Sequence, residues 1–240
     1  MMKEDCMLSE HGLILLNNPP FRCKYSRYHD INYALSHFDN DVSIHRLHVI
    51  CKTELGRIRK ILKRADGIGH VEYEERKGYR ITEKGIEYNK FWFAIQHRFD
   101  IMDIVPSAFK IHDVSYDEEL IKLLMDNISN IDPRKKPCYK SHRYTRRDYL
   151  TRYLDALRYL KKHREVIISA IRNSVNIGDE YERFEEDALS RGHIRFSEGK
   201  TSRKGKPCIK ATSKGLALLR AVNWIVTECD LGDYVPSIVG

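Results

Sequence analysis

Apolar residues recur at intervals of three and four along the first part of the chain, which is the spacing of a helix with one buried face. The pattern predicts helices over residues 30–38, 44–50 and 54–65. At the start of each stands a residue that can cap a helix N-terminus: Asp30, Ser43 and Thr53. The pair Asp66-Gly67 ends the third predicted helix.

Past residue 70 the apolar residues change from a helical to an alternating spacing. Residues 71–73 and 79–81 alternate apolar and polar side chains, as strands with one buried face do. Residues 76–78 between them predict a hairpin tip, and Thr82 can cap a long apolar helix that ends near Phe99. The predicted order is therefore three helices, a hairpin and a fourth helix.

This arrangement is repeated later in the chain. Residues 69–73 (GHVEY) match 192–196 (GHIRF), residues 81–85 (ITEKG) match 211–215 (ATSKG), and residues 103–107 (DIVPS) match 233–237 (DYVPS). His193 lies 123 positions after His70, whereas Gly215 lies 130 positions after Gly85, so the second copy carries one insertion of seven residues. The shared ends and constant offsets favour an internal duplication over chance similarity.

The offset of 123 continues upstream without a gap, so Ile31 and Ala34 fall on Leu154 and Leu157. Because apolar positions fall on apolar positions, the second copy is expected to share the core of the first. It predicts helices over residues 150–162, 165–174 and 178–189, with the second the least well defined by its turns. One further amphipathic helix, over residues 117–127, is expected between the copies.

The segments from Gly78 to Gly85 and from Cys208 to Gly215 resemble the second wing strand and following helix of the winged-helix DNA-binding proteins. The resemblance covers about 70 residues per copy. It implies a mainly α fold with small β-wings (α+β), built from two winged-helix modules in tandem. The expected bounds are 12–109 for the first module, 110–148 for a helical and basic linker, and 149–240 for the second module. It also implies that the third helix enters the major groove and that the wing contacts the backbone or minor groove.

Composition favours a polyanionic partner. The 240 residues carry a net charge of +8 and have a pI of about 9.1, with 42% hydrophobic and 32% charged residues, which suits a folded, soluble protein. No apolar run is long enough to cross a bilayer, and we do not expect the N-terminal ten residues to be a secretory signal. We therefore expect a cytoplasmic protein associated with nucleoid or chromatin, and no membrane partner.

Sequence features of enzymes are not found. The six cysteines are scattered without the spacing of a zinc site, and reduced thiols are expected. The chain has neither a Gly-rich phosphate loop nor a Gly-x-Ser-x-Gly elbow. We expect no catalytic residue, no metal and no cofactor.

The two predicted third helices carry opposite charge. Residues 52–64 hold six basic residues against one acidic residue, a net charge of +5. The matching residues 175–187 hold one basic residue against six acidic ones, a net charge of −5. A helix with this negative charge is repelled by phosphates, so only the first copy is expected to read DNA with its third helix.

The expected DNA-binding residues fall into three groups. The first copy contributes its third helix, the residues just before it and its wing: Lys52, Thr53, Arg57, Arg59, Lys60, Lys63, Arg64, Arg76 and Lys77. The linker contributes Arg134, Lys135, Lys136, Lys140, Arg143, Arg146 and Arg147, and the long second wing contributes Lys200, Arg203, Lys204 and Lys206. For each group the alternative is a solvated basic surface without a partner.

The acidic segment from Asp179 to Asp187 is a candidate contact for a basic surface of a second copy of the chain, which would give a homo-oligomer. A solvated acidic face is the alternative. Double-stranded DNA is the main expected partner and a transcriptional regulator the main expected function. A plasmid or viral replication initiator is a second hypothesis. A protein-interaction scaffold that uses winged helices without DNA is a third.

Overall fold

The computed structural model describes residues 6–8, 13–111, 118–129, 148–175, 177, 180–201, 207–229 and 231. The chain forms two compact units. The first comprises Met1–Ala94 and Val105–Ile121, and the second comprises Ile95–Ile104 and Lys122–Gly240. The helix α4 (Glu83–Arg98) therefore begins in the first unit, and its last turn is counted with the second.

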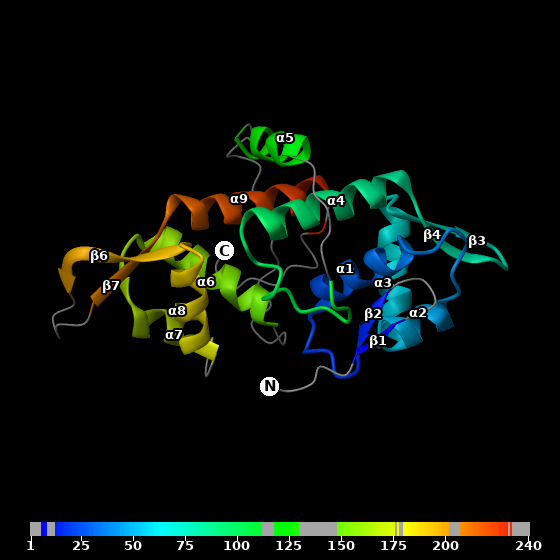
Figure 1. Cartoon of the computed structure of the whole chain (residues 1–240), viewed down its shortest axis with the longest axis horizontal. Coiled ribbons are helices and arrows are strands. Elements are labelled where there is room, and N and C mark those ends of the chain that lie inside the picture. The colour runs from blue at the N-terminus through cyan, green and yellow to red at the C-terminus, as the bar shows by residue number, and fades with distance from the viewer. Residues whose placement is uncertain are drawn as a thin grey trace. The chain divides into compact units, whose positions relative to one another are not determined.

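The first unit begins with a pair of antiparallel strands, β1 (Cys6–Leu8) and β2 (Ile14–Leu16). Three helices follow: α1 (Lys24–Leu35), α2 (Ile44–Ile50) and α3 (Leu55–Gly67). An antiparallel hairpin of β3 (Val71–Glu74) and β4 (Gly78–Ile81) then leads into α4 and projects from the helices, as Figure 1 shows. The predicted order of three helices, a hairpin and a fourth helix is confirmed.

The helix α5 (Glu118–Ser129) lies between two undescribed segments and buries Leu124 and Ile128. The second unit then repeats the order of the first. Its elements are α6 (Tyr149–His163), β5 (Val166–Ile167), α7 (Ile168–Val175), α8 (Tyr181–Ser190), β6 (Ile194–Thr201), β7 (Pro207–Ala211) and α9 (Ser213–Glu228). The described residues are thus mostly helical with small antiparallel sheets, as predicted.

In each unit a short extended segment that the sequence pattern does not reveal pairs with the second strand of the hairpin. In the first unit, Val42 and Tyr79 form a bridge through two backbone hydrogen bonds of 2.7 and 3.0 Å. In the second unit, β5 pairs with β7, so that Val166 lies opposite Ile209. The sheet of the second unit has the order β5-β7-β6, and Val42, β4 and β3 have the same order in the first. Segments this short are set by pairing across the chain, which leaves no local pattern.

The same buried hydrogen bond occurs in both units. The Tyr28 hydroxyl lies 2.8 Å from Nδ1 of His70, and the Tyr153 hydroxyl lies 2.7 Å from Nδ1 of His193. Both histidines are fully buried. Burial is the main cause that lowers the pKa of each histidine from 6.5 to about 4. The charge of Lys84 lowers the pKa of His70 further, and the charges of Lys214 and Arg191 do the same for His193.

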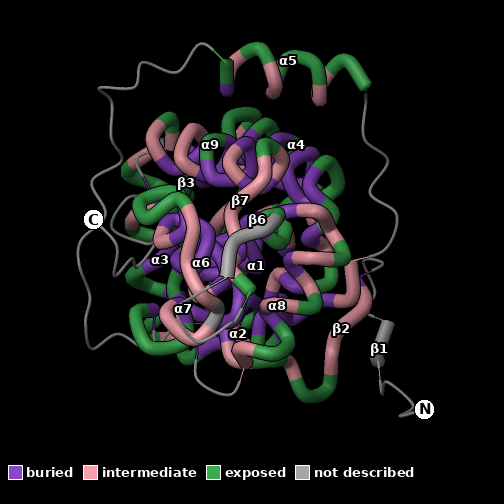
Figure 2. Tube along the Cα trace, turned by 90° about the vertical axis from the view of Figure 1, so that its left-hand side faces the viewer, coloured by how far each residue is buried: buried purple, intermediate pink, exposed green. Residues whose placement is uncertain are grey.

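The glycines that follow are equally constrained. A Cβ added to Gly85 would lie 2.2 Å from the His70 carbonyl oxygen, and one added to Gly215 would lie 2.3 Å from that of His193. Thr82 and Thr212 cap the two helices, accepting hydrogen bonds of 3.1 and 3.2 Å from those glycine amides. Close packing therefore requires glycine at both positions, and a hydrogen bond from the glycine amide fixes each threonine. Figure 2 shows buried positions alternating with exposed ones along α4 and mostly with half-buried ones along α9.

The first helix differs from its prediction. It begins at Lys24 rather than near Asp30, which lies in its middle and is buried, so Asp30 is not a cap. The ungapped offset of 123 is also wrong for this helix, because Tyr28 matches Tyr153 at an offset of 125. At that offset the first copy's Arg22, Ser26, Arg27, Tyr28 and Asp30 fall on Arg147, Thr151, Arg152, Tyr153 and Asp155.

Candidate nucleic-acid interface

The helix α3 separates apolar and basic side chains on opposite faces. Its buried residues are Ile58, Ile61, Leu62 and Ala65, as the spacing predicts. The basic residues Arg57, Arg59, Lys60 and Lys63 are exposed, and Arg64 is half-buried. Five of the predicted DNA-binding residues therefore lie on one helix, and four of them reach solvent.

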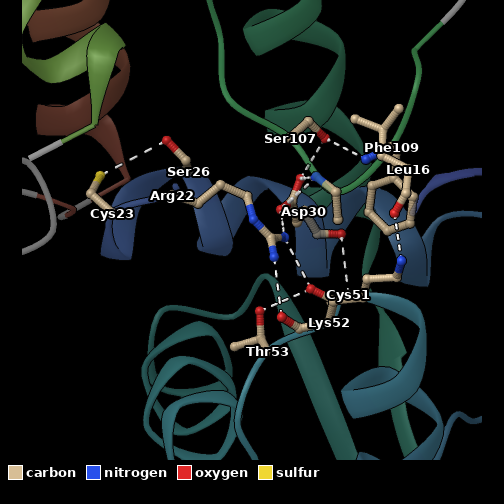
Figure 3. A network of polar contacts seen from close by, with 11 residues as sticks. Leu16, Arg22, Cys23, Ser26, Asp30, Cys51, Lys52, Thr53, Ser107 and Phe109 are labelled. Carbon is tan, nitrogen blue, oxygen red and sulfur yellow. Dashed lines mark hydrogen bonds and ion pairs between the residues drawn. The ribbon is translucent and has the colours of Figure 1, made fainter. Parts of the chain in front are cut away.

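A buried arginine, Arg22, fixes the turn between α2 and α3 by hydrogen bonds to its backbone. Arg22 is 4% exposed and pairs with Asp30, which is 3% exposed. Its Nη1 donates to the Cys51 carbonyl at 3.0 Å, and its Nη2 donates to the Lys52 carbonyl at 3.2 Å. Figure 3 shows this side chain reaching the turn. The turn that leads into α3 therefore has a fixed position relative to α1.

Asp30 also binds the segment that follows α4. The Ser107 hydroxyl donates to Oδ1 of Asp30 at 2.6 Å, and the Ala108 amide donates to Oδ2 at 3.1 Å (Figure 3). The carboxylate is thus satisfied by an arginine, a hydroxyl and a backbone amide, as a buried charge requires. Sequence patterns did not identify Arg22 or Asp30 for this role, because their partners lie far along the chain.

Two predicted backbone contacts are placed differently. The ammonium group of Lys52 donates to the carbonyls of Leu16 and Asn17 at 2.6 and 2.7 Å. Thr53 is 3% exposed, and its hydroxyl donates to the Cys51 carbonyl at 2.9 Å. The prediction that Thr53 caps α3 is therefore wrong, because Glu54 stands at the cap position without a side-chain cap. Contact of Thr53 with the DNA backbone stays a prediction.

The β3–β4 hairpin of the first unit, predicted as a wing, carries no net charge. Arg76 lies at the exposed hairpin tip with a φ of 67°, in the left-handed region. Lys77 pairs with Glu74, and Arg80 pairs with Glu72 at 2.5 Å. Residues 72–80 hold three acidic and three basic residues, so this hairpin adds no net charge to that of α3.

The acidic helix α8 of the second unit has partners within that unit. Asp187 accepts a hydrogen bond of 2.5 Å from the Tyr149 hydroxyl. It also forms ion pairs with Arg191 at 3.1 Å and with Arg183 at 3.5 Å. Glu185 receives the Tyr181 hydroxyl at 3.1 Å. Intramolecular contacts therefore satisfy two of its carboxylates, while Glu182 and Glu186 are exposed.

Corresponding positions along the edge between the first and third helices carry different charges in the two units. In the second unit, Arg152 pairs with Glu180. The equivalent residues of the first unit are Arg27, at an offset of 125, and Arg57, at an offset of 123. Similar backbone hydrogen bonds, from Arg57 to Glu54 at 2.9 Å and from Glu180 to Ile177 at 3.2 Å, support the second match.

A second pair of positions on this edge differs in the same direction. Tyr149 and Asp187 are hydrogen-bonded in the second unit, and their equivalents in the first unit are Lys24 and Arg64. Lys24 is exposed and Arg27 is half-buried. The apolar spacing places the start of the first helix six residues too late and therefore does not reveal either residue as a candidate site residue. The offset of 125 does reveal them.

The remaining predicted residues fall largely outside the described residues. These are the linker residues Arg134, Lys135, Lys136, Lys140, Arg143, Arg146 and Arg147, the wing residues Arg203, Lys204 and Lys206, and Asp179. Lys200 lies in β6, with an undescribed side chain. β6 extends to Thr201, so the second wing, predicted from Ser197, begins as strand.

Other kinds of site are not found in the described part of the chain. It holds no group of three or more His, Cys, Asp or Glu side chains that could bind a metal. Within the same residues, no helix combines the length and apolar character needed to cross a bilayer. Comparison with protein-family models, curated proteins and solved structures found no match.

Proposed function

We propose that this chain binds double-stranded DNA through the first unit and acts as a transcriptional regulator. The observation that carries the proposal is α3, which buries its apolar face and turns Arg57, Arg59, Lys60 and Lys63 toward solvent. Arginine can donate two hydrogen bonds to a guanine edge, and lysine suits phosphates. A fixed helix with this face can be inserted into a major groove as a rigid element.

We further propose that both units are winged helices. The order of helices, the hairpin and the sheet order with the first short segment beside the last strand support this assignment in each unit. The resemblance of residues 78–85 and 208–215 to wing strands and following helices supports it independently. In this arrangement α3 and α8 are the third helices, and the β3–β4 and β6–β7 hairpins are the wings.

The second unit is assigned a different role in this proposal. Its helix α8 holds four acidic residues against Arg183, which opposes phosphate binding. DNA contact from this unit is left to the basic residues of its wing and the linker. The pairing of Asp187 and Glu185 within the unit weighs against α8 as the contact of a homo-oligomer. A protein-binding surface that includes Glu182 and Glu186 is the second candidate, favoured by their exposure.

The direct test replaces Arg57, Lys60 and Arg64 together with Ala. Binding to random-sequence duplex DNA, measured by fluorescence anisotropy at about 50 and 200 mM salt, should weaken by roughly 100-fold or more, with a flatter salt dependence. The matched control is Lys161→Ala with Lys162→Ala, two exposed lysines at the end of α6. It should bind as the wild type does. Unchanged binding by the triple variant would exclude α3 as the reading helix.

A further inference from the structure

The edge between α1 and α3 lacks an ion pair that the second unit has at the equivalent positions. In the second unit, the guanidinium of Arg152 on α6 meets the carboxylate of Glu180 just before α8. In the first unit, the corresponding positions are occupied by Arg27 on α1 and Arg57 on α3. Two positive charges therefore stand where the fold otherwise places opposite charges.

The electrostatics of the first unit agree with this placement. Burial lowers the pKa of Arg27, and the charge of Arg57 lowers it further, followed by that of Arg22. Arg22 is already paired with Asp30 and holds the turn before α3, so its charge is neutralised locally. Glu54 is the acidic group nearby, and it pairs with Arg57 at 3.0 Å while remaining 74% exposed.

Two like charges fixed close together destabilise each other, and an anion between them offsets the repulsion. A phosphodiester has the charge and the oxygen atoms to accept hydrogen bonds from two guanidinium groups. Glu54 does not preclude this, because an exposed ion pair contributes little and its carboxylate can move aside. Lys24 and Arg64, which replace the hydrogen-bonded Tyr149 and Asp187, extend the positive edge in the same direction.

We propose that Arg27 and Arg57 together clamp one phosphate of the DNA backbone at the edge between α1 and α3. This inference rests on the proposed function, and it adds a contact from α1 that positions α3 in the groove. Arg27 supplies affinity and register rather than base recognition, because it reaches the backbone and not the base edges. The second unit lacks the clamp because Glu180 stands at the position equivalent to Arg57.

The first experiment measures how duplex affinity depends on salt for the wild type and for Arg27→Gln. Loss of one phosphate contact should lower the slope of log K against log salt by about 1 and weaken binding about equally for all sequences. The matched control is Arg152→Gln, the equivalent change in the second unit. It should lower the melting temperature, because it breaks the pair with Glu180, and leave the salt slope unchanged.

A second variant covers the case in which Arg27→Gln does not fold. Arg57→Glu places a carboxylate at the position equivalent to Glu180 of the second unit, so it should reduce duplex affinity at least 10-fold. A set of duplexes, each with one phosphate replaced by a neutral methylphosphonate, provides a readout without Arg27 variants. One position should weaken binding of the wild type and have no effect on Arg57→Glu.

The outcomes separate the two proposals. If the wild type binds duplex DNA and Arg27→Gln keeps the full salt slope, the clamp is overturned while the proposed function stands. The same holds if no methylphosphonate position distinguishes the wild type from Arg57→Glu. If the wild type does not bind duplex DNA at low salt, the proposed function and the clamp are both overturned.

Discussion

The two units of this chain share their buried positions and differ on their surfaces. Both hold a tyrosine–histidine hydrogen bond, a glycine against the histidine carbonyl and a threonine cap at equivalent places. Their third helices instead carry opposite charge, with α3 basic and α8 acidic. After a duplication, packing restricts the core positions, whereas the charge of an exposed face can change without disturbing the fold. The residues that differ are therefore better guides to function than those that match.

The largest expected effect concerns the buried ion pair that fixes α3. Asp30→Asn leaves Arg22 as a buried charge without a carboxylate, which should destabilise the first unit by about 3–5 kcal/mol. Trp92 lies in the first unit and Trp224 in the second, so variants that retain one tryptophan report the unfolding of one unit each. In urea unfolding followed by tryptophan fluorescence, the transition reported by Trp92 should move to a lower urea concentration, and that reported by Trp224 should not move.

Asp155→Asn is the matched change in the second unit, where Asp155 pairs with Arg158 at 2.9 Å. It should move the Trp224 transition and leave that of Trp92 in place. If Asp30→Asn leaves the Trp92 transition where it was, Arg22 does not depend on this carboxylate and the account of the turn is wrong.

Lowering the pH should unfold the two units at different pH values, with a smaller effect on stability than that of Asp30→Asn. His70 and His193 have pKa values lowered from 6.5 to about 4, so unfolding takes up protons as the pH falls between these values. Stability is full above about pH 6.5 and declines toward pH 4, by up to about 3 kcal/mol for each histidine. The first unit also buries His29, whose pKa burial lowers well below 6.5, so it should unfold at a higher pH than the second.

The measurement is a pH titration of the fluorescence of the two single-tryptophan variants. His29 stacks on Trp92, with ring centroids 4.2 Å apart and 6° between the planes. His29→Phe keeps an aromatic ring at this position, removes the titrating group and should shift the acid transition of the first unit toward that of the second. Coincident acid transitions in the presence of His29 would mean that its burial does not set the difference.

Local patterns predicted those parts of the fold that depend on local rules. Ser43 caps α2 and accepts a hydrogen bond of 3.2 Å from the Arg46 amide, as its position predicts, and the apolar spacing located the buried face of α3. The predictions failed where distant residues decide. The start of α1, the bridge at Val42 and the role of Asp30 all depend on partners elsewhere in the first unit.

The candidate site could be predicted in part, because the spacing of charged residues along a regular helix shows which face they occupy. Arg57 and its neighbours on α3 were therefore found. Lys24 and Arg27 were missed because the two copies were aligned without the two-residue shift between their first and third helices. Thr53 was misassigned, since a polar residue before a helix suggests a cap whether or not its side chain is buried.

The central claim is that only the first unit presents its third helix to DNA. Hydrogen exchange of the backbone amides of α3 and α8, measured by mass spectrometry with and without a duplex, tests it most directly. The account predicts slower exchange in α3 and its preceding turn when the duplex is added, with α8 unchanged. Protection of α8 without protection of α3 would contradict it.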